Sequence, residues 1–414
     1  MSRLRSNIFS VGVLQIVIYV ANFAALPYLT RILGVNLFGY YALIVAISQY
    51  AVVVTNWGFW GNTVRKISKD RINNEYVSGL FWATWFAQWL IFVALFFIAF
   101  CFMLILNCYG IKIDVHLFFA GVLIVAGSVL TPSWFLQGYE LFNVLSVSQI
   151  VPRLTALPLY YVFVKSPSDL SSALMITAFV GWASGIYCLY WIFSRNLVRL
   201  RIVNFSSVLE EIRDGAELVL SQIWIAFYVT LIPVFLGYIS GPAEVGIFNL
   251  ADKFKTAGTS LMTPISQALF PRMTELIHTD KRAAYKLFKR SSCVLIAISL
   301  IGGVAMYLLS DWIVYIFGGA SYQASSGLLK MMAPLPFLII IASIITTQVV
   351  LPLGDKKIYT KIYCISGLAS LIFMWPLMSE FGAVGAVLTM GIVESLVTIS
   401  MVIYLFHSGR KAFN

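Results

Sequence analysis

The chain has 414 residues, of which 60% are hydrophobic, 15% are aromatic and only 11% are charged. Soluble domains carry about 25% charged residues, so this composition excludes an ordinary soluble enzyme and predicts a polytopic membrane protein. A net charge of +11 would suggest a nucleic-acid partner in a soluble protein. Here membrane topology explains the basic residues, and we expect no nucleic-acid partner.

Apolar runs of about 20 residues between polar or basic connectors predict twelve transmembrane helices. Six are expected near 8–30, 37–58, 79–106, 115–136, 144–164 and 172–194. Six more are expected near 217–239, 245–270, 291–309, 326–352, 362–378 and 383–406. The predicted fold is therefore an all-α membrane protein with an N-terminal six-helix bundle (1–194), a cytoplasmic connector (195–216) and a C-terminal six-helix bundle (217–414).

The orientation follows from the basic residues, which accumulate in short cytoplasmic loops. With the amino terminus inside, most lysines and arginines fall inside, and only Arg31, Lys112 and Lys165 fall in outside loops. An even number of helices then places both termini in the cytoplasm. The basic connectors 195–216 and 271–290 are expected to lie as surface helices on the inner leaflet.

The two halves of the chain show an internal repeat with a shift of 207 residues. The shift pairs Gly34 with Gly241, Gly39 with Gly246, Gln15 with Gln222 and Arg65 with Arg272. Six helices return the chain to its starting side, so the repeat predicts two pseudo-symmetric bundles related by an axis near the membrane normal. Such transporters usually hold their substrate between the halves.

The stretch Val245–Phe270 is long enough to cross a bilayer and still carries three charged side chains. On one predicted helix its polar residues form a stripe at steps of three or four: Asn249, Asp252, Thr256, Thr259, Thr263 and Ser266. A charge that faces lipid at the helix centre costs roughly 2.5 to 3.5 kcal/mol even on the lenient scale. The stripe is therefore expected to face a watery or protein-lined cavity, which indicates a transport pathway.

Three cations are candidates to hold an anionic substrate group in that cavity, because ammonium and guanidinium groups bind phosphate strongly in water-poor sites. Lys255 lies three residues after Asp252, so it can instead form a structural ion pair. Lys253 has no such partner in its own helix. Arg153 lies between two prolines, and it can either satisfy backbone carbonyls that the prolines free or contact the substrate.

Polar and acidic residues complete the candidate site. The polar residues expected to line the cavity are Gln15, Asn22, Gln49, Gln222 and Asn249. Asp252 and Glu394 are candidates to bind a coupling proton or sodium ion, and the alternative for Glu394 is pairing with a basic residue.

Catalytic and metal-binding patterns are absent from the sequence. The histidines His116, His278 and His407 are isolated, and the five cysteines have no metal-ligand spacing. No phosphate-cradling GxxxxGK[ST] loop occurs, so direct use of ATP is not expected. We expect neither an enzyme nor a resident cofactor.

Three stretches resemble the Wzx-type flippases for O-antigen and other lipid-linked oligosaccharides, in the multidrug/oligosaccharidyl-lipid/polysaccharide exporter superfamily. They are PYLTRILGVNLFGYYA (Pro27–Ala42), TPSWFLQGYE (Thr131–Glu140) and VGIFNLADKFKTAGTSLMTPISQALFPRM (Val245–Met273). The resemblance implies a V-shaped pair of six-helix bundles in a bacterial inner membrane. It further implies alternating-access transport of an undecaprenyl-pyrophosphate-linked oligosaccharide from the cytoplasmic to the periplasmic leaflet, among membrane lipids and polysaccharide assembly proteins.

Two other functions compete with this interpretation. A cation-coupled multidrug exporter of the same superfamily would favour an acidic lumen, whereas the intramembrane charges here are more basic than acidic. A membrane glycan polymerase, which is an enzyme, would need a large periplasmic loop, and the predicted outside loops are short.

Overall fold

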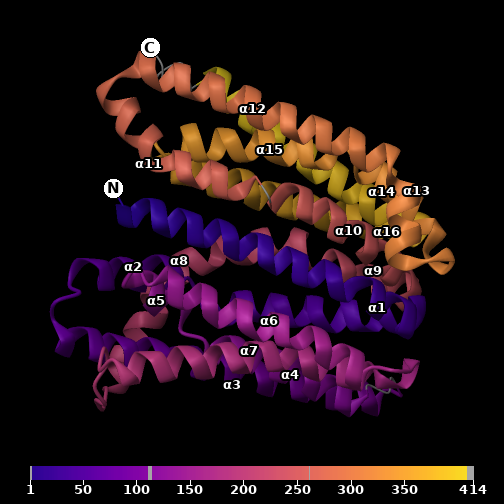
Figure 1. Ribbon diagram of the computed structural model, residues 1–414, viewed down its shortest axis with the longest axis horizontal. Coiled ribbons are helices and arrows are strands. Elements are labelled where there is room, and N and C mark those ends of the chain that lie inside the picture. Colours follow the sequence, from indigo (N-terminus) through magenta and orange to yellow (C-terminus); the bar gives the residue numbers. More distant parts are fainter. Residues whose placement is uncertain (1, 111–113, 261, 408–414) are drawn as a thin grey trace. The chain divides into compact units, whose positions relative to one another are not determined.

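The computed structural model describes residues 2–110, 114–260 and 262–407, and every regular element in these ranges is helical (Figure 1). Some side chains lie outside the description, mostly among residues 2–19, 217–229 and 263–271. The first helices are α1 (Ser2–Asn56), α2 (Phe59–Lys69), α3 (Asn74–Cys108), α4 (Val115–Leu130), α5 (Ser133–Gly138), α6 (Phe142–Phe163), α7 (Leu170–Ser194) and α8 (Phe205–Thr230). The remaining ones are α9 (Ile232–Ser240), α10 (Pro242–Ser260), α11 (Thr263–Thr279), α12 (Lys281–Leu308), α13 (Ser310–Gly318), α14 (Gln323–Met332), α15 (Leu335–Ile345), the π-helical turn η3 (Thr346–Val350) and α16 (Lys356–His407).

Within the described residues, six helices are long and apolar enough to cross a membrane. They are Phe23–Lys69, Asn74–Cys108, Val115–Gly138, Pro167–Ser194, Lys281–Leu308 and Lys357–His407. A seventh is formed if Ala320–Met332 and Leu335–Val350, which are bent by 42°, make one span. The chain is thus a multi-pass membrane protein, and the expected total of twelve helices stays a prediction.

The chain divides into two compact units, and no single division of the sequence separates them. The first unit comprises Met1–Leu33 and Tyr41–Ala226, and the second comprises Gly34–Tyr40 and Phe227–Asn414. The short segment Gly34–Tyr40 therefore belongs to the second unit although both of its neighbours in the chain belong to the first. Helix α8 also crosses the division, and it begins at Phe205, inside the stretch expected as a connector.

The long helix α1 contains a sharp break at Gly34, between the two helices expected at 8–30 and 37–58. Gly34 has φ 70° and ψ 176°, and Gly241, its partner under the 207-residue shift, has φ 89° and ψ 170°. Residues with a Cβ rarely adopt a positive φ of this kind, which explains glycine at both positions. The internal repeat therefore extends to the backbone conformation at these turns.

The second glycine of each repeat lies where two backbones touch. A Cβ on Gly39 would overlap the carbonyl of Pro242, and a Cβ on Gly246 would overlap the carbonyl of Val35. Val35 and Pro242 are themselves related by the 207-residue shift, so the contact is symmetric. Small residues allow such close approach of helices in membranes.

The first unit has an aromatic core where α2, α3 and α5 meet. Phe81, Trp134 and Phe135 are almost fully buried there, and the Trp134 indole nitrogen donates to Gln88 Oε1 at 2.9 Å. Trp134 and Phe135 belong to the stretch Thr131–Glu140 that carries part of the family resemblance. This stretch therefore serves as a packed corner of the fold.

Prolines mark several helix breaks in the second half of the chain. The stretch Val245–Phe270 was predicted as one helix, and this prediction is wrong, because α10 ends at Ser260 and α11 begins at Thr263. Pro264 in the first turn of α11 lacks the N–H that would continue the helix from Ser260. Pro233 in the first turn of α9 explains the break after α8 in the same way.

Candidate functional site

Helix α10 carries the charged residues that distinguish the second half from the first. It packs against α9, α14, α15 and α16 within the second unit. Near its start, the Glu244 carboxylate accepts a hydrogen bond from the Ala383 amide at 2.8 Å, next to the break of α16 at Gly382. The charged residues farther along α10 are thus fixed against a well-packed set of helices.

Lys255 and Asp252 form the ion pair that their spacing suggested. Lys255 Nζ lies 2.5 Å from Asp252 Oδ1, and Lys255 is only 6% exposed. Glu394 on α16 also interacts electrostatically with Lys255. A single ammonium group therefore faces two carboxylates inside the second unit. Both candidate coupling acids thus interact with this one cation, and a contact of Lys255 with substrate stays a prediction.

Lys253 differs from Lys255 in its surroundings. Residues two apart on a helix are rotated by about 200°, so the two side chains leave α10 on different faces. Lys253 is half-buried, and it has no hydrogen bond or salt bridge among the described residues, although the charge of Asp252 acts on it. An ammonium group in this state can bind an anion without first losing an ion pair.

Arg153 on α6 is half-buried and contacts its own helix. Its guanidinium donates to the Gln149 carbonyl at 3.2 Å and to Gln149 Oε1 at 3.3 Å. The carbonyl that Pro152 frees is that of Ser148, and it accepts from Ser184 Oγ of α7 at 2.6 Å. Arg153 therefore does not satisfy the carbonyl that Pro152 frees, although it does support the helix through Gln149.

The other candidate residues are spread over both units. Gln49 is exposed, and Gln222 and Asn249 are half-buried. The side chains of Gln15 and Asn22 lie outside the described part of the structure. Their role in lining a cavity stays a prediction.

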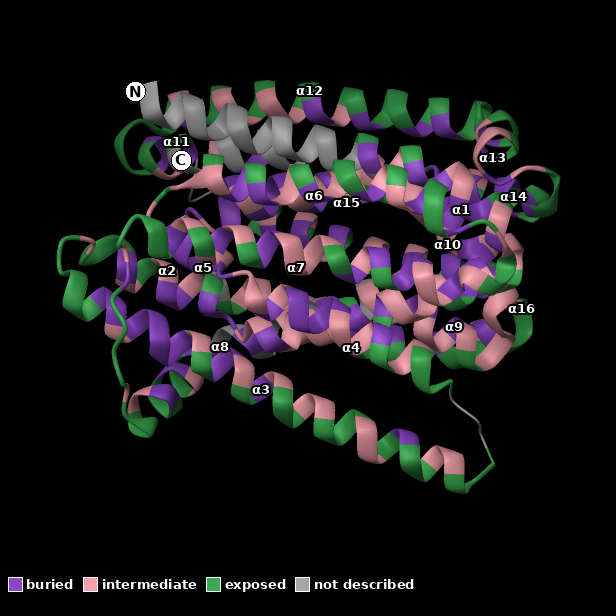
Figure 2. Cartoon of the chain, turned by 60° about the horizontal axis from the view of Figure 1, so that its bottom comes forward, coloured by how far each residue is buried: buried purple, intermediate pink, exposed green. Residues whose placement is uncertain are grey.

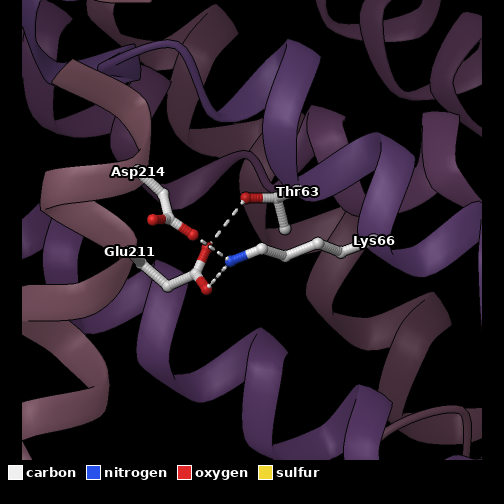
Figure 3. Close-up of polar contacts among 4 residues, drawn as sticks. All are labelled: Thr63, Lys66, Glu211 and Asp214. Atoms are coloured by element: carbon white, nitrogen blue, oxygen red, sulfur yellow. Dashed lines mark hydrogen bonds and ion pairs between the residues drawn. The ribbon is translucent and has the colours of Figure 1, made fainter. Parts of the chain in front are cut away.

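A polar network that the sequence did not reveal joins α2 to α8 in the first unit (Figure 3). Lys66 Nζ lies 2.5 Å from Glu211 Oε1 and 2.7 Å from Asp214 Oδ2, and Thr63 donates to Glu211 at 3.4 Å. Burial raises the pKa of Glu211, whereas the hydrogen bond from Lys66 lowers the pKa of Asp214. The Trp57 indole adds a bond to the Ile212 carbonyl at 2.8 Å. The start of α8 is thereby fastened to α2.

Residues 4–277 match the model of the family described as "Polysaccharide biosynthesis protein". The chain belongs to this family. It is also 30% identical to a protein of Escherichia coli (strain K12) named "Putative O-antigen transporter", over 97% of this chain and 96% of that protein. The resemblance that the three stretches carry is thereby confirmed at the level of the family.

Two solved structures with this fold are those of a multidrug resistance transporter and a lipid II flippase. An inward-facing multidrug resistance transporter of the MATE family has 14% identity and a TM-score of 0.75, with 97% of this chain and 98% of that chain covered. The lipid II flippase MurJ, in an inward closed conformation, has 13% identity and a TM-score of 0.70, with 96% and 88% covered. At these identities the likeness shows the fold alone.

Proposed function

We propose that this member of the family is a flippase for an undecaprenyl-pyrophosphate-linked oligosaccharide, such as an O-antigen repeat unit. It moves the substrate from the cytoplasmic to the periplasmic leaflet of a bacterial inner membrane by alternating access. The proposal includes twelve transmembrane helices with both termini in the cytoplasm and no enzymatic step. The family match and the E. coli relative named for O-antigen transport support it.

The observation that carries the proposal is the contrast between Lys253 and Lys255. Lys255 is engaged by Asp252 and Glu394, whereas Lys253 has no salt bridge among the described residues. A free ammonium group on a helix of a membrane protein is costly unless it serves a ligand. A diphosphate offers the negative charge and the acceptor oxygens that such a group binds.

Ion coupling enters the proposal through Lys255. Asp252 and Glu394 both interact with it, so a proton or sodium ion bound to either carboxylate would weaken its hold on Lys255. Arg153 supplies a second contact for the substrate in the first unit. The partners in this scheme are the lipid-linked substrate, membrane lipids and polysaccharide assembly proteins.

A multidrug exporter is the main competing function, and the MATE structure shares the fold. An exporter of cationic drugs would need an acid without a salt bridge at the place where the described part of this chain has such a lysine. Among the described residues, Asp252 of α10 forms a salt bridge and Lys253 does not. This arrangement favours an anionic substrate.

The test uses cells that lack the chain and carry a plasmid copy of the wild type, Lys253→Gln, Arg153→Gln or Lys69→Gln. Lys69 is an exposed cation on α2 and serves as the matched control. We expect Lys253→Gln to reduce surface glycan at least about tenfold, since a charge-assisted contact is worth about 1.5 to 3 kcal/mol. Lipid-linked repeat units should then accumulate in the cytoplasmic leaflet, with normal protein levels.

Two outcomes would overturn the proposal. One is a normal surface glycan in cells that lack the chain altogether. The other is normal glycan display by both Lys253→Gln and Arg153→Gln at unchanged protein level. Loss of drug resistance with intact glycan would favour the exporter instead.

A further inference from the structure

Helix α12 has one exposed face that runs along its whole length (Figure 2). Exposed residues recur on it at steps of three and four, from Lys281 to Leu308. The opposite face is buried in the second unit through Ala284, Leu295 and Met306. The exposed face is therefore a single continuous stripe on the outer side of α12.

The chemistry of this stripe changes once along the helix. Its exposed members in the first ten residues are cationic apart from Tyr285, namely Lys281, Arg282, Lys286, Lys289 and Arg290. From Val294 onward the exposed side chains are apolar or small, with Val294 52%, Ile301 69% and Leu308 70% exposed. The apolar part is the surface that lipid chains cover in a membrane helix.

The length of α12 places the cations next to the lipid headgroups. A helix of 28 residues is about 42 Å long at 1.5 Å per residue. The hydrocarbon core is only about 30 Å thick, so the first turns of α12 extend beyond it. The stretch 271–290 was expected to lie flat on the inner leaflet as a surface helix, whereas its last ten residues continue directly into the span Lys281–Leu308.

The cations also lie at the electrostatically unfavourable end of the helix. The positive end of the helix dipole is at the N-terminus, so Lys281 and Arg282 in the first turn are repelled by it. Asp280 caps the helix through the Ala283 amide at 3.0 Å. None of the five cations forms a salt bridge within the part of the chain that the structure describes. Asp280 is thus a nearby carboxylate from the chain itself, and phosphate groups outside the chain can offset the repulsion that remains.

We propose that this cationic end of α12 binds the headgroups of anionic phospholipids in the adjacent leaflet. The cations share one face with the apolar stripe, so they point toward the same lipids whose chains cover Val294 and Ile301. Phosphate groups in that layer supply negative charge beyond that of Asp280, and each basic residue strengthens attraction to an anionic surface. The positive-inside rule identifies the leaflet as the cytoplasmic one.

The experiment uses Cys293, which is exposed on the stripe at the boundary between its cationic and apolar parts. An environment-sensitive fluorophore is attached there in the full chain after Cys101, Cys108 and Cys364 are replaced by alanine. The protein is placed in phosphatidylcholine vesicles that contain a small amount of spin-labelled phosphatidylglycerol or spin-labelled phosphatidylcholine. Quenching of the fluorophore then reports which lipid lies beside the cationic residues.

Two variants are compared in the labelled background. One carries Arg282→Gln, Lys286→Gln, Lys289→Gln and Arg290→Gln. The matched control loses four exposed cations elsewhere, through Arg65→Gln, Lys69→Gln, Arg199→Gln and Arg213→Gln. We expect a severalfold quenching preference for phosphatidylglycerol in the parent and the control, and equal quenching by both lipids in the α12 variant.

Equal quenching by both lipids in the parent would overturn the proposal, as would a preference that survives in the α12 variant. Quenching by neither lipid would also overturn it, because water or another protein would then cover this face. If undecaprenyl diphosphate, added to the vesicles, abolishes the preference at a concentration where phosphatidylglycerol does not, the stripe serves the transported lipid. None of these outcomes depends on the role of Lys253.

Discussion

Gly39 and Gly246 are equivalent positions of the internal repeat, and they lie on the two sides of one close backbone contact. Gly39 lies against the carbonyl of Pro242, and Gly246 lies against the carbonyl of Val35. The repeat of 207 residues thus contributes both sides of one symmetric interaction. The requirement for glycine at these two positions is steric, because no side-chain rotation can relieve an overlap with backbone atoms.

We therefore expect Gly39→Ala to destabilise the protein by about 1 to 3 kcal/mol, the usual cost of overpacking. Gly302→Ala on α12 is the matched control, because a Cβ at Gly302 meets no atom within 4 Å. The measurement is the temperature at which half of the purified protein aggregates. Equal midpoints for the two variants would contradict this account of the contact.

Loss of the Lys255 ammonium should be strongly destabilising. Removal of one partner of a buried ion pair costs about 3 to 5 kcal/mol, because the other charge stays buried without compensation. Lys255→Met would leave Asp252 and Glu394 in that state. We expect the thermal midpoint to fall clearly and to recover in part when Asp252→Asn is added. No recovery in the double variant would show that Lys255 acts mainly through Glu394.

The α2–α8 network should give a distinct dependence of stability on pH. The pKa of Asp214 is lowered by the hydrogen bond from Lys66, so its stabilising effect is present above its unfolded pKa of about 3.9 and is lost as pH falls through the lower folded value. Between pH 5 and pH 3 the wild type should therefore lose more stability than Asp214→Asn. The raised pKa of Glu211 makes stability depend on pH in the opposite sense. Glu211 is present in both proteins, so the comparison isolates the effect of Asp214. Identical pH profiles would exclude this contribution.

Ser184 should contribute to the stability of the protein, because its hydroxyl takes the place of a missing backbone amide donor. It is 4% exposed and donates to the Ser148 carbonyl that Pro152 leaves without an amide partner. Ser184→Ala should cost about 1 to 3 kcal/mol, the penalty for a buried polar group without a partner. Ser194→Ala, at an exposed position of the same helix, is the control and should change the thermal midpoint very little.

Proline alone could not decide where the helices break. Pro152 lies inside continuous α6 because Ser184 of another helix satisfies the freed carbonyl. Pro233 and Pro264 instead begin new helices. The difference depends on hydrogen-bond partners from distant parts of the chain, and a single sequence does not show them. Helix ends were easier to predict where an apolar run gives way to polar residues. Helix α7, for example, was expected at 172–194 and spans Leu170–Ser194.

The same limit applies to the charged residues. Spacing of three along one helix suggested the Asp252–Lys255 pair as one of two alternatives, and the structure contains it. The Lys66–Glu211 pair joins residues that are 145 positions apart, so no local pattern could reveal it. The acidic residues Glu211 and Asp214, three apart in the connector, were the only signal, and they did not identify a partner. Whether the polar residues line one cavity stays a prediction.

The place of Gly34–Tyr40 in the second unit has a consequence for biosynthesis. The segment is made before its partners Pro242 and Gly246, which follow about 200 residues later in the chain. At about 5 to 20 residues per second, the ribosome needs roughly 10 to 40 s to reach them. During this interval Gly34–Tyr40 lacks its native partners, so the backbone contact that holds this segment in the second unit forms only after the second half of the chain has been made.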